Sequence, residues 1–187
     1  MWRNGPASYG IVSIALHWAI AFLFLAEIPL GYAMTHIGNA PVLQFQLYQW
    51  HKSIGFLVLA LSIPRLIWIV FSPAPHPPAG LTPAERAGAK AAKIALYAFT
   101  IAVPLAGWAI ASVTPLQIPS FVFNLVVVPN LPLPISRTLE DIFSDMHAVL
   151  AYVAGAVALL HAAAALRHHL VLRDATLVRM LAVRKIR

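Results

Sequence analysis

The stretch DMHAVLAYVAGAVALLHAAAALRHH, residues 145–169, is the last strongly apolar segment of the chain. Its histidines His147 and His161 lie 14 residues apart within a run rich in alanine, valine and leucine. On an α-helix, 14 residues bring two side chains back to within about 40° of each other, with roughly 21 Å between them along the axis. The segment therefore predicts a membrane-length helix with an imidazole near each end of one face.

The composition indicates a membrane protein. Of 187 residues, 60% are apolar and only 10% are charged, whereas about a quarter of the residues in a soluble domain are charged. So few charges cannot cover a water-facing surface, and we expect lipid to surround most of the chain. The net charge of +7 then fits basic ends that face anionic lipid, rather than a nucleic-acid surface.

The chain contains no cysteine. This excludes disulfides, thiolate zinc sites, iron–sulfur clusters and covalently attached c-type haem. A metal or cofactor must therefore be held by histidine, carboxylate, methionine or backbone groups.

Four apolar segments are predicted to cross the membrane; they span residues of about 11–34, 50–71, 90–113 and 138–168. The first is longer than the apolar region of a secretory signal and no clear cleavage site follows it, so we expect an uncleaved span. Residues 35–49 are expected to form a connector around the turn at 38–41. The third helix is expected to begin at the capping box of Thr82 and Glu85.

A proline-rich connector, residues 114–137, precedes the last span. Its apolar core at 121–128 is too short to cross about 30 Å of hydrocarbon. We expect this segment to lie at the membrane interface or to cap the bundle.

Cations are concentrated on one side of the predicted topology. The N-terminus, the loop after the second span and the tail at 170–187 hold most of them, whereas Lys52 and Arg137 are the two on the opposite side. The positive-inside rule places both termini in the cytoplasm. The sequence therefore predicts an all-α membrane protein, a four-transmembrane-helix bundle that forms a single domain over residues 1–187.

This topology sorts four histidines into two depths. His17, early in the first span, and His161, late in the fourth, lie towards the cytoplasm. His51, at the start of the second span, and His147, early in the fourth, lie towards the outer face. We therefore predict an inner pair on spans one and four and an outer pair on spans two and four.

A single histidine near the end of a span more often hydrogen-bonds a neighbouring helix than binds a ligand. Four at matched depths favour a function, because ionisable groups in apolar spans are rare and usually functional. Between His147 and His161 the residues are small, namely Ala151, Ala154, Gly155 and Ala158. They leave room for a flat cofactor or allow close helix packing.

Haem is the cofactor that two imidazoles from facing helices fit best. Zinc normally takes three or four protein ligands, and no carboxylate accompanies either pair at depth. Haem iron needs two axial ligands, and its apolar macrocycle fits between the helices of a bundle. We predict two b-type haems, each with both axial positions filled, which points to electron transfer across the bilayer rather than oxygen binding.

Other polar residues suggest further contacts. Arg65 lies 14 residues after His51 and is a candidate partner for the inner haem's propionates, or a snorkelling arginine. Lys52 could contact the outer propionates or anchor the interface. Glu27 and the tryptophans are expected to be interface groups.

Several motifs resemble those of the bacterial cytochrome b561 family over nearly the whole chain. They are Leu16-His17-Trp18, the run Trp50-His51-Lys52-Ser53-Ile54-Gly55 followed by Arg65-Leu66, Pro104-Leu105-Ala106-Gly107-Trp108, and the block that joins His147 and His161 to His168-His169 and Asp174-Ala-Thr-Leu-Val-Arg179-Met180. The resemblance implies a four-helix, di-haem b-type cytochrome of the bacterial inner membrane.

The resemblance also implies roles for single residues. The family's axial histidines carry over onto His17, His51, His147 and His161, and a family histidine placed near quinone carries over onto His168. Some members have histidines early in span three where this chain has Lys90 and Lys93. This difference puts the inner-face contacts to quinone or propionates in question.

A family member of this kind acts as a superoxide oxidase, which implies electron transfer from periplasmic superoxide to ubiquinone. An alternative is an electron-transfer subunit that serves a membrane dehydrogenase or a periplasmic redox partner. An alternative from another class is a haem-free helical bundle, such as a transporter or assembly factor. The sequence alone does not separate the first two.

Overall fold

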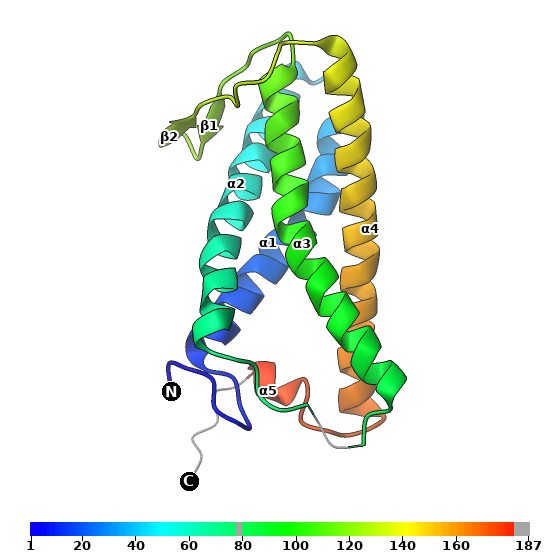
Figure 1. Cartoon of the computed structure of the whole chain (residues 1–187). Helices are drawn as coiled ribbons and strands as arrows, with labels where there is room; N and C mark the ends of the chain where they lie inside the picture. The colour runs from blue at the N-terminus through cyan, green and yellow to red at the C-terminus, as the bar shows by residue number, and fades with distance from the viewer. Residues whose placement is uncertain (78–79, 182–187) are drawn as a thin grey trace.

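Four long helices dominate the computed structural model, which describes residues 1–77 and 80–181. In chain order the elements are α1 (Ile11–His36), α2 (Pro41–Phe71), α3 (Pro83–Val113), β1 (Ser120–Val122), β2 (Val126–Val128), α4 (Arg137–Leu170) and α5 (Val178–Leu181). The helices α1 to α4 are each long and apolar enough to cross a membrane, and they run side by side in one bundle (Figure 1). The predicted four-helix membrane fold is confirmed.

The bundle consists of two helix pairs. Helix α1 packs chiefly against α2 and α3 chiefly against α4, while α2 also contacts α3 and few contacts join α1 to α4. The buried core includes Ile20, Val58, Val103 and Ala154. Many large apolar side chains instead face outward, such as Val70, which is 75% exposed. An apolar outer surface of this extent fits lipid as the surrounding solvent.

The small residues in the middle of α4 allow close helix packing. Ala154 is fully buried, and a Cβ added to Gly155 would lie 2.7 Å from Cδ1 of Ile28 on α1. Of the two interpretations offered by the sequence, helix packing therefore holds at this level.

The start of α2 differs from the sequence prediction. The connector expected at 35–49 is a turn only over 37–40, and residues 41–49 are helical. A helix of 31 residues is roughly 46 Å long, which exceeds the hydrocarbon thickness, so its first turns need not be apolar. The polar residues that suggested a loop make contacts here: Gln44 Nε2 donates to the carbonyl of Met34 at 3.1 Å, at the end of α1.

The start of α3 follows the prediction. Thr82 Oγ1 accepts a hydrogen bond from the Glu85 amide at 3.2 Å, and Glu85 Oε2 accepts one from the Thr82 amide at 3.0 Å. The predicted capping box is therefore present.

The connector between α3 and α4 contains an antiparallel hairpin, with Ser120 paired to Val128 and Val122 to Val126. It packs against the N-terminal half of α2 (Figure 1). There the buried Ser53 hydroxyl accepts a hydrogen bond from the amide of Phe123 at 3.0 Å and donates to the carbonyl of Gln49 at 2.7 Å. The sequence prediction had assigned no strand to this connector.

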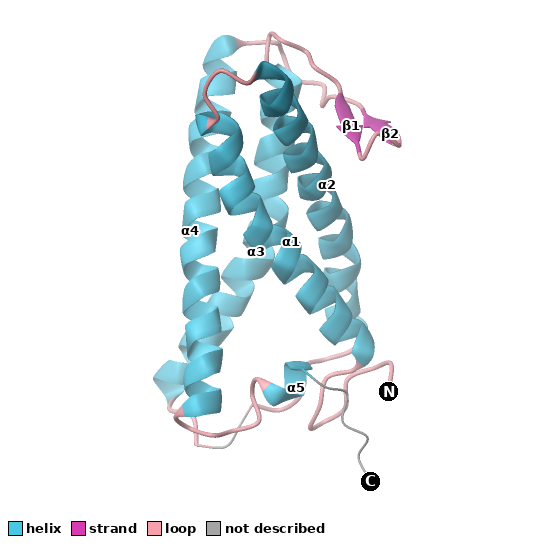
Figure 2. Cartoon of the chain, turned by 180° about the vertical axis from the view of Figure 1, so that it is seen from behind, coloured by secondary structure: helices cyan, strands magenta, loops and turns pink. Residues whose placement is uncertain are grey.

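The segment before α1 and helix α5 lie at the other end of the bundle (Figure 2). Asn4 Nδ2 donates to the carbonyl of Ser72 at 2.8 Å, and Arg179 donates to the carbonyl of His76 at 2.9 Å. Trp18 Nε1 donates to the carbonyl of Met180 at 2.7 Å. Part of the predicted tail, residues 171–181, therefore folds back on the bundle, and the rest, 182–187, lies outside the described residues.

Candidate functional site

The outer pair of histidines joins α2 to α4. The ring centroids of His51 and His147 lie 6.0 Å apart, with the ring planes at 83° to each other. Both residues are half-buried. The structure thus brings together the two histidines that the sequence assigned to the outer depth.

The inner pair joins α1 to α4. The ring centroids of His17 and His161 lie 6.3 Å apart at an interplanar angle of 70°. His17 is half-buried, and His161 is exposed. Each pair connects the α1–α2 half of the bundle to α4, so both lie between the two helix pairs.

The spacing of both pairs fits one metal ion held between two imidazoles. With metal–nitrogen bonds of roughly 2 Å, as for imidazole on zinc, the two ring centroids stand roughly 6 Å apart. No group of three or more histidine or carboxylate side chains suited to a metal ion occurs within residues 1–77 and 80–181. The site therefore fits an ion whose other ligands come from a macrocycle, as haem iron does, and does not fit zinc.

The Nδ1 atoms of the outer pair face acceptor groups. His147 Nδ1 donates to the carbonyl of Val103 on α3 at 3.0 Å. Glu27 Oε2, on α1, lies 2.9 Å from His51 Nδ1, although the two groups are not aligned as a full hydrogen bond. The bond to Val103 holds the ring proton of His147 at Nδ1 and leaves its Nε2 as the nitrogen that can bind a metal, and the carboxylate beside His51 Nδ1 favours the same tautomer there.

Two glycines lie against the outer rings. A Cβ added to Gly31 would lie 3.2 Å from Cε1 of His51, and one added to Gly107 would lie 3.2 Å from Cε1 of His147. Gly31 is four residues after Glu27, so both occupy the same face of α1. The missing side chains leave the space that the two imidazoles fill.

A cation lies beside the inner pair. Arg65 Nη2 donates to His17 Nδ1 at 3.0 Å, and the guanidinium carbon lies 5.2 Å from the centroid of the Tyr97 ring. The predicted site residue Arg65 therefore does lie at the inner level.

Lys52 lies at the outer end but points to the connector. Its Nζ donates to the carbonyl of Pro119 at 3.1 Å. Of the tryptophans assigned to the interface, Trp108 donates from Nε1 to the carbonyl of Pro129 at 3.0 Å, and Trp68 donates to the Ser13 hydroxyl at 3.0 Å.

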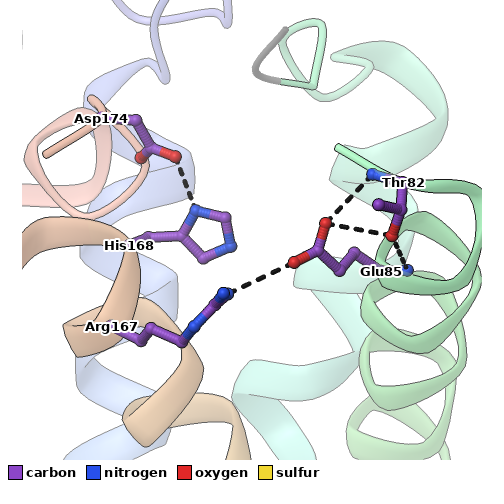
Figure 3. A network of polar contacts seen from close by, with 5 residues as sticks. All are labelled: Thr82, Glu85, Arg167, His168 and Asp174. Carbon is purple, nitrogen blue, oxygen red and sulfur yellow. Dashed lines mark hydrogen bonds and ion pairs between the residues drawn. The ribbon is translucent and has the colours of Figure 1, made fainter. Parts of the chain in front are cut away.

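His168 lies at the inner end of α4 within a polar network (Figure 3). Its Nδ1 is 2.5 Å from Oδ2 of Asp174, in the segment that folds back. Burial alone would raise the pKa of Asp174, but hydrogen bonds from Thr176 and His168 outweigh it and lower the pKa to about 2. The neighbouring Arg167 contacts Glu85 of α3 at 3.3 Å, whereas Lys90 and Lys93 are exposed.

The sequence analysis missed three residues at the outer level. It assigned Glu27 to the interface, but the structure places this carboxylate against His51. Gly31 and Gly107 were not singled out as site residues. A carboxylate inside an apolar span was the available signal, because such groups are usually functional.

Comparisons with known proteins identify the family of this chain. Residues 8–182 match the family model described as prokaryotic cytochrome b561. Cytochrome b561 homolog 2 of Escherichia coli (strain K12) is 32% identical over 178 residues, which cover 95% of this chain and 93% of that relative. Proteins of this family bind b-type haem and transfer electrons in membranes. The chain belongs to the prokaryotic cytochrome b561 family.

Proposed function

We propose that this protein is a di-haem superoxide oxidase of the bacterial inner membrane, which passes electrons from periplasmic superoxide to ubiquinone. The balanced reaction converts two superoxide anions, one quinone and two protons into two molecules of oxygen and one quinol. The observation that carries the proposal is the presence of two histidine pairs, 6.0 and 6.3 Å between centroids, at opposite depths of one bundle.

The residues present suit two haems. His51 with His147 would hold the outer one, and His17 with His161 the inner one. When bound, haem held by both imidazoles of a pair would supply one-electron transfer. The protein's part is to orient the four imidazoles and keep the surroundings apolar.

Arg65 would change partner when haem is bound. In the structure its guanidinium donates to His17 Nδ1, which places the ring proton on Nε2. Ligation through Nε2 instead favours a proton on Nδ1. We expect Arg65 to move to a haem carboxylate, which matches its planar donor groups better than an imidazole does.

The distribution of charge supports the proposed orientation. The segment before α1, the start of α3 and residues 171–181 lie at one end of the bundle (Figure 2), and these segments contain Arg3, Arg86, Arg173 and Arg179. The connectors 37–40 and 114–136 lie at the other end. The cation-rich end would face the cytoplasm.

His168 and Asp174 would serve the quinone at the inner end, because quinone reduction consumes protons. With a pKa of about 2, Asp174 is ionised at neutral pH. Its carboxylate stabilises a proton on His168 Nδ1, in contact at 2.5 Å. His168 can then hold a proton, or a hydrogen bond, for a quinone carbonyl.

The outer surface also favours a second candidate donor, a periplasmic redox protein. Lys52 donates to a connector carbonyl, and Arg137 contacts Glu140 at 3.3 Å. Glu140 therefore offsets part of the charge of Arg137, and Lys52 is oriented towards the connector. The exposed Asp141 and Asp145 would repel this anion and attract a basic protein partner instead.

The test is quinol formation by the purified, haem-loaded protein in quinone-containing lipid vesicles, with superoxide generated enzymatically outside. We expect reduction of the b-type absorption bands and quinol formation that superoxide dismutase abolishes. His147→Ala, which removes one outer ligand, is the matched control and should form no quinol.

Slow reduction of the bands by superoxide, without quinol, would exclude superoxide oxidase activity. Efficient reduction by a co-purified periplasmic redox protein would then support the second candidate. Absence of low-spin b-type bands would exclude both and favour a haem-free bundle.

A further inference from the structure

We propose that Glu27 is a positioning residue that lowers the reduction potential of the outer haem relative to the inner one. This inference rests on the proposed di-haem function and adds to it a cause for the direction of electron flow. It assigns a role to a carboxylate that the electron-transfer scheme above does not otherwise need.

The contact is made across a helix interface at the outer level. Glu27 Oε2 on α1 lies 2.9 Å from His51 Nδ1 on α2, and the two side chains are only 14% and 16% exposed. A Cβ added to Gly55, one turn after His51 on α2, would lie 3.7 Å from the same oxygen. Gly31 of α1 thus leaves room for the imidazole, and the carboxylate lies within ordinary van der Waals distance of the space beside Gly55.

Glu27 lacks the partners that a purely structural carboxylate would have. Among the described residues its Oε1 is buried with no hydrogen-bond partner, and no lysine or arginine forms an ion pair with it. Burial of a carboxylate without compensation is costly. A cationic metal centre held by His51 would provide that compensation.

The negative charge of Glu27 determines the direction in which the reduction potential of the outer haem shifts. Oxidation of haem iron adds one positive charge, so a nearby anion stabilises the oxidised form and lowers the potential. An acceptor at Nδ1 acts in the same direction, because it increases the basicity of the imidazole towards the metal. The low dielectric of the bundle interior strengthens both effects.

The inner level has the opposite neighbour. Arg65 lies 3.0 Å from His17 Nδ1 in the structure and would contact a carboxylate of the inner haem once haem is bound. In either position it is a cation at the inner level, and a cation stabilises the reduced form. The anion Glu27 at the outer level and the cation Arg65 at the inner level therefore both favour an electron on the inner haem. Transfer from the outer face to the inner face becomes downhill.

The experiment is a spectroelectrochemical titration of the haem-loaded protein in detergent, with Glu27→Gln compared to the unmodified chain. Each haem gives its own reduction step, or wave, in the titration. His17→Ala, which is expected to retain only the outer haem, identifies the wave of the outer haem. We expect Glu27→Gln to raise the outer potential so that the oxidised-to-reduced ratio at a fixed potential falls about tenfold, which is about 59 mV for one electron. The inner wave and the haem content should not change.

Two variants complete the design. Glu27→Asp keeps the charge on a shorter side chain, so its outer potential should lie nearer to that of the unmodified protein. Asp141→Asn removes an exposed acid from the outer end of α4, so it should leave both waves in place.

An unchanged outer potential in Glu27→Gln, with both haems bound, would overturn the inference and leave the proposed function intact. Equal shifts in both waves, or loss of the outer haem from this variant, would also overturn it. Failure of the unmodified protein to bind two haems would instead count against the proposed function.

Discussion

The outer and inner histidine pairs have similar geometry, with ring centroids 6.0 and 6.3 Å apart, but different surroundings. At the outer level a carboxylate and two glycines adjoin the rings. At the inner level an arginine adjoins His17, a tyrosine packs against that arginine, and His161 is exposed.

This difference separates two properties of the site. The spacing of the rings follows from the helix repeat of α4 and from the pairing of the helices, and it is nearly the same twice. The neighbouring charges, Glu27 and Arg65, do not depend on that repeat. They can therefore give the two haems different reduction potentials without altering the histidines that hold each haem.

The largest effect is expected from filling the space beside one outer ring. Gly107→Leu adds atoms where even a Cβ would lie 3.2 Å from His147, and the packed bundle cannot readily yield. We expect haem content to fall from two to one per chain, with the inner haem retained. Gly88→Leu, on the same helix with no atom within 4 Å of an added Cβ, is the control and should keep both haems. Full haem content in Gly107→Leu would show that the outer ring does not depend on this space.

A smaller effect is expected from removal of the inner cation. Arg65→Gln should lower the potential of the inner haem, so that the oxidised-to-reduced ratio at a fixed potential rises about tenfold, or about 59 mV. The outer wave should stay in place, and Arg65→Lys, which keeps the charge, should retain most of the inner potential. A potentiometric titration gives both values, and a shift confined to the outer wave would contradict the assignment of levels.

The smallest effect is expected at the inner end, away from both pairs. Asp174→Asn should slow quinone reduction several-fold without changing haem content, because His168 loses the anion that stabilises its proton. The folded pKa of about 2 lies below the ordinary value of 3.8, so this contact stabilises the fold above pH 4 and weakens as the pH falls towards 2. The rate difference between the unmodified chain and Asp174→Asn should therefore be present throughout pH 6 to 8. Equal rates for the two proteins in that range would contradict a role for this carboxylate.

The sequence predicted the features that depend on local periodicity and chain order. The 14-residue spacing of His147 and His161 is a property of one helix, and alternating spans fix which end each histidine approaches. Together they predict the partners His17 and His51, which the structure places 6.3 and 6.0 Å from His161 and His147 between ring centroids. The capping box at Thr82 is equally local.

The sequence could not predict features that depend on how neighbouring helices are rotated about their axes. Glu27 meets His51 because α1 presents that face to α2, and Gly107 meets His147 because α3 presents that face to α4. Composition alone also misassigned 41–49, since polar residues in a helix that extends beyond the hydrocarbon resemble a loop. The return of 171–181 depends on contacts with Trp18 and His76, which are distant in sequence.

The most direct test of the two-level pairing is haem content per chain in double histidine variants, measured by the absorbance of the extracted pyridine complex. Variants that lose both members of one pair, His51→Ala with His147→Ala or His17→Ala with His161→Ala, should each retain one haem. Variants that lose one member of each pair, such as His51→Ala with His161→Ala, should retain none. One haem in this last variant, or none in the first two, would contradict the pairing of His51 with His147 and of His17 with His161.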